Sequence, residues 1–235
     1  MMYIVFLLIL IISFMIITVI SVVQGKKPKE AVITEKTQCK NYIQSIAFLW
    51  GATLIVFIMC FIGNISLGDL GFRLISFQYN IWFTVITLTV SVLALGYFIY
   101  QFIASLVSVK FRKKQLADSH KGAIEVLPRT KKEKLLFSFV ALSAGICEEI
   151  IFRGFLVFLV QSIFPGMPIY FVILISTVIF GISHAYQGIS GVIGTGILAV
   201  LFMCLFFVTN SLLLPILLHF IVDFSATFAL SEEEV

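Results

Sequence analysis

The chain has 235 residues, of which 60% belong to the hydrophobic types and only 12% are charged. Its mean hydropathy is +1.12, whereas soluble domains are about half apolar and about a quarter charged. This composition excludes an ordinary soluble domain and predicts a polytopic membrane protein whose main partner is the lipid bilayer.

The basic residues are concentrated in two segments. Five of the 16 Lys and Arg residues lie in loop 25–41 and nine lie in loop 109–134. The net charge of +4 therefore comes from two basic loops and not from a basic surface. Because basic residues beside spanning segments resist translocation, both loops are predicted to be cytoplasmic. Phosphate binding by the KFRKK run at residues 110–114 is the weaker interpretation, and no nucleic-acid partner is expected.

A helix that crosses a bilayer needs about 20 mainly apolar residues. Candidate spans run over residues 2–24, 42–66, 80–108, 135–163, 168–184, 191–208 and 212–230. The sequence therefore predicts an all-α fold, a polytopic bundle of about seven transmembrane helices. The first span lacks a basic leader and a small-residue cleavage site, so we expect it to be retained, with the N-terminus outside the cell.

Prolines, glycines and cysteines add local expectations. The Pro-Gly-Met-Pro turn at residues 165–168 should separate the fourth and fifth helices and leave them as antiparallel neighbours. The glycines of the sixth helix, Gly188, Gly191, Gly194 and Gly196, indicate a tightly packed helix interface. The cysteines show no CxxC spacing, so we expect neither disulfides nor zinc ligands. Cys60, Cys147 and Cys204 should be small packing residues in the membrane, and Cys39 a free thiol in a loop.

Six ionisable side chains fall inside the apolar spans of the second half. They are Glu148, Glu149 and Arg153 on the fourth helix, His184 at the end of the fifth, and His219 and Asp223 on the seventh. Each such group costs about 3 kcal/mol at membrane depth and normally faces a cavity or another polar group. We therefore expect an active site in a cavity between helices four, five and seven.

Helical spacing separates the roles of these groups. Glu149 and Arg153 are four residues apart and can pair. Glu148 points about 100° away, so its carboxylate is not needed for this pair and is available for catalysis. His219 and Asp223 are also four apart, so the carboxylate can bond the imidazole or both can face one target. The alternative is that all six only fix helix packing, although apolar residues would do so at lower cost.

A carboxylate and two imidazoles in a partly dry cavity suit hydrolysis. The carboxylate takes a proton from water, the water attacks a carbonyl, and hydrogen-bond donors stabilise the oxyanion. Glu148, His184, His219 and Asp223 could instead ligate Zn²⁺ with an open position. Because no HExxH motif is present, we favour a reaction without metal or other cofactor.

Three segments also resemble the motifs of a known family. SAGICEEIIFRGFL (143–156), FGISH (180–184) and HFIVD (219–223) are similar to the three motifs of the CAAX protease and bacteriocin-processing family, also called the Abi family, of intramembrane endopeptidases. The family pattern EExxxR, FxxxH and HxxxN or HxxxD is filled by Glu148, Glu149, Arg153, Phe180, His184, His219 and Asp223.

The resemblance implies a role for each motif residue. Glu148 would be the general base, acting with His184, while His219 and Asp223 would bind the oxyanion and orient the scissile carbonyl. Because an ionised carboxylate cannot donate a hydrogen bond, Asp223 would be either protonated or used to orient His219. Glu149, Arg153 and Phe180 would support these four residues.

The resemblance extends to LGDLGFRL (67–74) and LPRTKKEKLLF (127–137). It implies a protease core over residues 67–230, preceded by N-terminal transmembrane helices over residues 1–66, of which 1–41 lie outside the family core. The orientation set by the basic loops places the acidic tail at 231–235 in the cytoplasm.

The resemblance also implies a substrate class. The expected substrate is a small or membrane-anchored peptide in a bacterial plasma membrane, cleaved in bacteriocin-leader or signalling-peptide maturation or in self-immunity. CAAX prenyl endopeptidase activity and a non-catalytic immunity or scaffold role are the alternatives. A proton-coupled transporter has little support because the chain lacks paired repeats.

Overall fold

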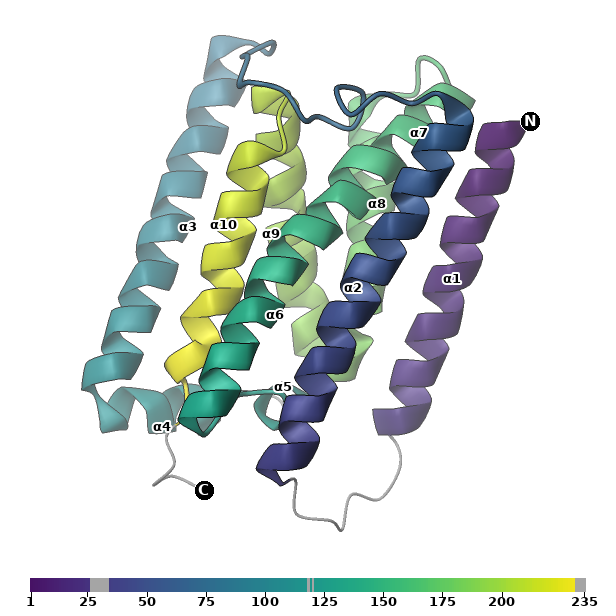
Figure 1. Cartoon of the computed structure of the whole chain (residues 1–235). Helices are drawn as coiled ribbons and strands as arrows, with labels where there is room; N and C mark the ends of the chain where they lie inside the picture. Colours follow the sequence, from purple (N-terminus) through teal and green to yellow (C-terminus); the bar gives the residue numbers. More distant parts are fainter. Residues whose placement is uncertain (26–33, 118, 120, 231–235) are drawn as a thin grey trace.

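The computed structural model describes residues 1–25, 34–117, 119 and 121–230, and every regular element in these ranges is a helix (Figure 1). The long helices are α1 (Met2–Gly25), α2 (Glu35–Gly63), α3 (Ile81–Val107), α6 (Lys131–Glu149), α8 (Ile169–Ser183), α9 (Gly188–Thr209) and α10 (Leu213–Phe224). The π-helix η1 (Ile150–Phe155) and α7 (Leu156–Ile163) continue α6 without a break. The predicted all-α polytopic bundle is confirmed.

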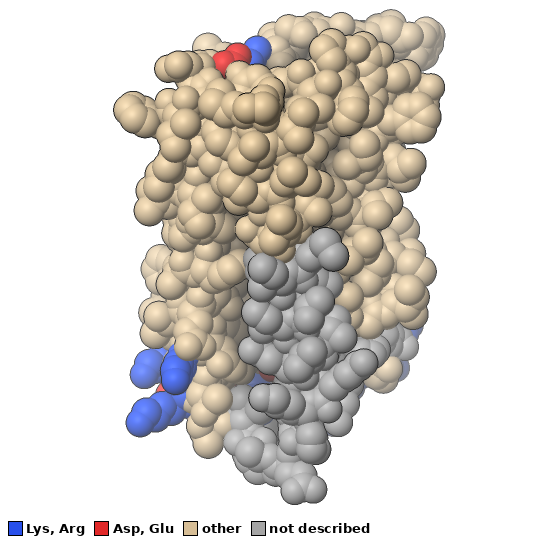
Figure 2. All heavy atoms as spheres, turned by 90° about the vertical axis from the view of Figure 1, so that its right-hand side faces the viewer, with Lys and Arg blue, Asp and Glu red and all other residues tan. Residues whose placement is uncertain are grey.

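Four helical segments are long and apolar enough to cross a membrane: Glu35–Gly63, Ile81–Val107, Lys131–Ile163 and Ala185–Thr209. Shorter apolar helices cover Met2–Ser13, Ile169–Ser183 and Leu213–Phe228. Lys and Arg gather at the lower end of the face in Figure 2, the end at which α4 and α5 lie in Figure 1. The chain is therefore a multi-pass membrane protein.

The basic segment between α3 and α6 is largely helical. Loop 109–134 forms α4 (Val109–Ala117), α5 (Lys121–Glu125) and the first turn of α6, which opens with a capping box between Thr130 and Glu133. Residues 26–33 of the other basic loop and residues 231–235 of the acidic tail lie outside the described residues.

The second helix begins earlier than predicted, at Glu35 instead of residue 42. Thr34 caps it by accepting the Thr37 backbone N–H at 3.3 Å, and a cap of this kind offsets the unpaired donors of a first turn. The placement of Cys39 in a loop is therefore wrong, because this thiol lies in α2 and is buried. The absence of disulfides is confirmed, since all four cysteines are free.

The predicted antiparallel pairing on the two sides of the 165–168 turn is confirmed. The hydroxyl of Ser176 on α8 donates to the backbone oxygen of Phe152 in η1 at 3.4 Å. The rings of Phe152 and Phe180 meet edge to face at 4.9 Å between centroids. The π-helix η1 is fully buried against these neighbours, and such π segments are frequent at functional sites.

Helix α8 ends inside the bundle. Its 15 residues span about 22 Å, which is less than the hydrocarbon thickness of about 30 Å. The chain then turns through His184, the short η2 (Ala185–Gln187) and Gly188 at φ +79° into α9. Non-helical backbone at membrane depth is tolerated where it is buried in protein or lines a water-filled cavity, so this reversal marks a polar interior.

The loop between α2 and α3 closes the opposite end of the bundle. The Leu212 backbone N–H donates to the Gly71 oxygen at 3.0 Å, and a Cβ on Gly154 would lie 2.8 Å from the Leu70 oxygen. Within the loop, the Ser66 hydroxyl and backbone N–H both donate to Asp69. These hydrogen bonds lower the pKa of the exposed Asp69 carboxyl.

Helices α6 and α10 cross in close contact at Gly145. A Cβ at this position would lie 3.0 Å from the Phe220 backbone nitrogen and 3.1 Å from its Cα. Backbone atoms cannot move aside as a side chain can, so Gly145 permits the short distance between these helices. Because Phe220 follows His219, the same crossing brings His219 towards the two glutamates at the end of α6.

We expect Gly145→Ala to lower the free energy of unfolding by about 1–3 kcal/mol, because overpacking forces the two backbones apart. Unfolding of the purified protein in mild detergent, followed by tryptophan fluorescence, measures the change. Gly51→Ala on α2 is the matched control, since a Cβ there meets nothing within 4 Å. Equal stability of the two variants would contradict a steric limit at the crossing.

Candidate active site

An ion pair between two fully buried side chains forms the base of the site. Arg153 Nη1 on η1 donates to Glu149 Oε1 on α6 at 2.8 Å, and both side chains have no solvent exposure. The guanidinium lies 4.5 Å from the centre of the Phe180 ring and 5.2 Å from that of Phe202. The predicted pairing of Glu149 with Arg153 is confirmed.

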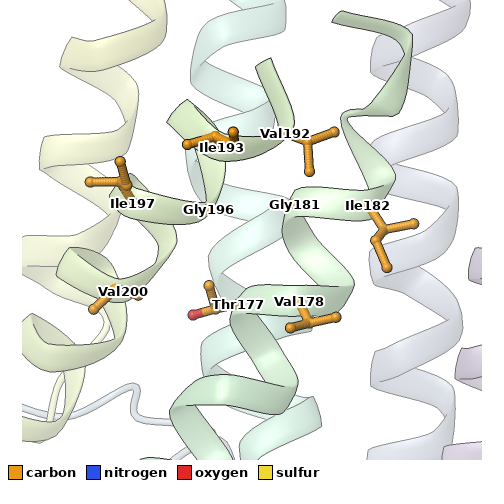
Figure 3. A pocket seen from close by; sticks show the side chains of 9 residues that line it. All are labelled: Thr177, Val178, Gly181, Ile182, Val192, Ile193, Gly196, Ile197 and Val200. Atoms are coloured by element: carbon orange, nitrogen blue, oxygen red, sulfur yellow. The ribbon is translucent and has the colours of Figure 1, made fainter. Parts of the chain in front are cut away.

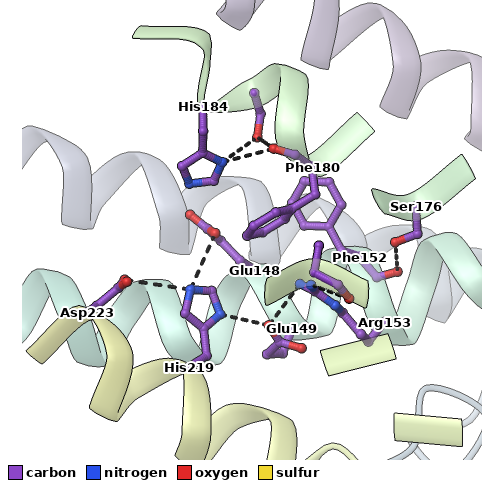
Figure 4. A network of polar contacts seen from close by, with 11 residues as sticks. Glu148, Glu149, Phe152, Arg153, Ser176, Phe180, His184, His219 and Asp223 are labelled. Atoms are coloured by element: carbon purple, nitrogen blue, oxygen red, sulfur yellow. Dashed lines mark hydrogen bonds and ion pairs between the residues drawn. The ribbon is translucent and has the colours of Figure 1, made fainter. Parts of the chain in front are cut away.

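Glu149 has a second partner that the sequence did not predict. His219 Nδ1 on α10 donates to the same Glu149 Oε1 at 2.7 Å. This carboxylate therefore joins α6, η1 and α10 at one point (Figure 4). Because Glu149 and His219 are 70 positions apart, the helical spacing of the sequence carried no signal for the contact.

Glu148 is directed away from the Glu149–Arg153 pair, as predicted. Figure 4 shows its carboxylate between the rings of His184 and His219. Its Oε2 atom is buried, makes no hydrogen bond within the described part of the chain, and lies 3.9 Å from His219 Nε2. An acceptor in this position can bind a water molecule or a substrate group.

Local hydrogen bonds fix the orientation of His184 where α8 ends. Its Nδ1 lies 2.9 Å from the Phe180 backbone oxygen and 3.1 Å from the Ser183 hydroxyl. A carbonyl can only accept, so Nδ1 carries the hydrogen, and in the neutral ring Nε2 is the acceptor. The Phe180 ring packs on the imidazole at 4.7 Å, which explains why Phe180 occurs four residues before it.

Asp223 lies one turn after His219 on α10. Its Oδ2 is 3.6 Å from His219 Nε2, and its side chain is 36% exposed. His219 thus has Glu149 at Nδ1, and Glu148 and Asp223 near Nε2. The structure brings together all of the sequence-predicted site residues.

A cavity of about 280 Å³ adjoins these groups. Its walls come from α8, α9, α10 and the turn between α8 and α9: Phe180, His184, Gln187, Gly191, Gly194, Thr195, Leu198, Phe202, His219, Val222 and Asp223. The sequence placed the cavity between helices four, five and seven. Helices five (α8) and seven (α10) do line it, but α9, the sixth long helix, supplies the remaining wall and helix four contributes no lining residue. The prediction of tight packing at Gly194 is wrong, because a Cβ there would meet nothing within 4 Å.

Two residues of α9 that the sequence analysis did not single out support the site. Phe202 stacks on the His219 ring, with centroids 5.0 Å apart and planes 25° apart. The Ala199 backbone oxygen lies 3.5 Å from Arg153 Nη2 and accepts a hydrogen bond from it. Both belong to an apolar helix, so their residue types gave no chemical signal.

The arrangement does not fit the zinc alternative. Among the described residues, no three His, Cys, Asp or Glu side chains are placed to hold one metal ion. We therefore derive no step through a metal.

The fold and the enclosed acid and base groups define an intramembrane hydrolase. Residues 131–225, which contain all three motifs, match the family described as type II CAAX prenyl endopeptidase Rce1-like. Over these residues the chain is therefore similar to the CAAX protease and bacteriocin-processing family of membrane endopeptidases. No curated protein and no solved structure gives a significant match.

Arg153→Ala should lower the free energy of unfolding by about 3–5 kcal/mol, because it leaves the Glu149 carboxylate buried without its cationic partner. Chemical unfolding in detergent measures the loss. The control is Lys131→Ala, which removes a cation from the exposed first turn of α6. A stability of Arg153→Ala close to that of the control would show that the buried pair does not hold the helices together.

Proposed function

We propose that the protein is an endopeptidase in which Glu148 activates water for attack on a peptide bond inside the membrane. One observation carries this proposal. The Glu148 carboxylate is buried, has an oxygen with no hydrogen-bond partner among the described residues, and lies between two imidazoles. Hydrogen bonds hold four other polar groups of this site, Glu149, Arg153, His184 and His219, whereas this buried carboxylate keeps an acceptor for a substrate or a water molecule.

The proton moves twice in the proposed reaction. Glu148 takes a proton from a water molecule that also donates to His184 Nε2, and the resulting hydroxide attacks the carbonyl carbon. The tetrahedral intermediate then collapses, the C–N bond breaks, and protonated Glu148 returns the proton to the leaving amine. The products are a carboxylic acid and an amine, so the reaction needs no co-reactant besides water.

We assign the oxyanion to His219. In its doubly protonated form, this ring donates from Nδ1 to Glu149 and from Nε2 towards the cavity. Fixed donors of this kind stabilise developing negative charge because they need no reorganisation during the reaction. Asp223, at 3.6 Å from Nε2, orients this ring, since an ionised carboxylate cannot itself donate to an oxyanion.

Glu149, Arg153 and Phe180 act as positioning residues. Arg153 holds Glu149, Glu149 holds His219, and the Phe180 backbone oxygen holds His184. Each imidazole is thereby fixed through Nδ1 and presents Nε2 towards the substrate space. Such orientation is a large part of catalysis, because a misplacement of about 1 Å can lower a rate about a hundredfold.

The substrate that we propose is a small or membrane-anchored peptide, as in bacteriocin-leader or signalling-peptide maturation or self-immunity at a bacterial plasma membrane. Loops 25–41 and 109–134 would then face the cytoplasm, and residues 67–230 would form the catalytic core. The match to the type II CAAX prenyl endopeptidase family favours one second candidate, cleavage of a prenylated CAAX protein. A non-catalytic immunity or scaffold role would need the same fold but no reactive carboxylate.

Glu148→Gln should reduce cleavage about 10²–10⁴-fold, because the amide cannot accept the proton from water. The measurement uses protein reconstituted in liposomes with a mixture of synthetic apolar peptides, analysed by mass before and after incubation. Glu125→Gln, outside the site, should cleave like the unchanged protein. Undiminished cleavage by Glu148→Gln would refute the proposed base, and an unchanged cellular phenotype with a folded variant would favour the scaffold role.

Chelation tests the absence of a metal from the proposed mechanism. Dialysis against EDTA followed by 1,10-phenanthroline should leave the cleavage rate of the reconstituted protein unchanged, because no step uses a metal. The metal content of the purified protein, measured by mass spectrometry, provides an independent readout. Loss of activity that returns on addition of Zn²⁺ would contradict the glutamate mechanism.

A further inference from the structure

One face of α9 forms a wall of the cavity that His184 and His219 also line. Gly191, Gly194, Thr195 and Leu198 follow one another at helical spacing on this face, and Phe202 continues it. His184, Gln187, His219 and Asp223 supply the other polar lining. The cavity therefore has one side with ionisable groups and one side, formed by α9, without them.

This division limits how a peptide can enter. The cavity, at about 280 Å³, is near the lower end of ligand pockets, which begin at about 300 Å³. A carbonyl placed against Glu148 and His219 leaves room only for the groups next to the scissile bond. A side chain there must point away from the reactive groups, which directs it towards α9.

The two glycines of this face, Gly191 and Gly194, differ in the space that lies beside them. A Cβ on Gly194 would meet nothing within 4 Å, and this residue is an exposed part of the cavity lining, so a larger side chain fits here without displacing the protein. At Gly191 the corresponding space is already filled, because a Cβ would lie 2.2 Å from the Gln187 Cβ. Gly194 is therefore the position at which the residue type sets the open width.

Resting on the proposed function, we propose that the α9 wall around Gly194 is the subsite for the substrate side chain next to the scissile bond. The subsite takes a bulky apolar side chain, because Leu198, Phe202 and Val222 line it. The Thr195 hydroxyl needs no hydrogen-bond partner from the substrate, since it already donates to the Gly191 backbone oxygen at 2.8 Å. Gly194 sets the largest side chain that fits.

The same helix provides a matched control on its other side. Gly196 lines a separate apolar groove between α8 and α9 (Figure 3), together with Gly181, Ile193 and Ile197. A Cβ on Gly196 would make an ordinary contact of 3.9 Å with Thr177. Gly196→Ala thus adds a methyl group two residues away without narrowing the reactive cavity.

The test compares cleavage profiles of the unchanged protein, Gly194→Ala, Gly194→Val and Gly196→Ala in liposomes. The probe is a library of synthetic peptides with apolar segments, and mass spectrometry identifies every cleaved bond. We expect Gly194→Val to lower cleavage beside Leu, Ile and Phe at least about tenfold relative to cleavage beside Gly and Ala, since pocket fit discriminates by such factors. Gly194→Ala should have a smaller effect in the same direction, and Gly196→Ala should keep the original profile.

Three other results overturn the proposal. An unchanged profile for Gly194→Val, an equal loss for all side chains, or the same shift in Gly196→Ala would each show that Gly194 does not select the substrate. Thermal unfolding of each variant separates selection from loss of folded protein. Failure of the proposed function itself is distinguishable, because the unchanged protein would then cleave no peptide or would cleave equally well as Glu148→Gln.

Discussion

The buried contact among Arg153, Glu149 and His219 is the interaction on which the site depends. Two fully buried charges on one helix are costly unless they are paired and hydrogen-bonded, and here one carboxylate oxygen contacts both the guanidinium and the imidazole of α10. The Phe180 and Phe202 rings pack against the guanidinium, with centroids 4.5 Å and 5.2 Å from its carbon. Removal of any member leaves a charge without compensation in a region where water cannot replace it.

Two backbone features bring the reactive groups to this contact. Gly145 allows α10 to approach α6 closely enough for His219 to reach Glu149. The short length of α8 places His184 at the end of a helix inside the bundle, where the turn into α9 lines a cavity. The reactive side chains thus come from a crossing point and a helix end, and both are set by backbone geometry.

The proposed catalysis and the proposed selectivity use different walls of one cavity. The polar wall, with His184 and His219, and the adjacent Glu148 carboxylate would do the chemistry on any peptide carbonyl that reaches them. The α9 wall carries no charged side chain and would select substrate side chains by size alone. A change of substrate could then arise at Gly194 without any alteration of the acid and base groups, which separates the evolution of selectivity from that of mechanism.

The sequence by itself determined the membrane class, the all-α fold, the positions of the main helices and the motif residues. It could do so because apolar length and the cost of buried charges act locally along the chain, so that Glu149 and Arg153 were paired from their spacing alone. The tertiary structure decided what depends on contacts between distant segments: the second partner of Glu149 on α10, the stacking of Phe202 on His219, and the α9 wall at Gly194. Apolar residues and glycines look alike whether they pack against lipid, protein or a cavity, and only the packed bundle shows which of these each one meets.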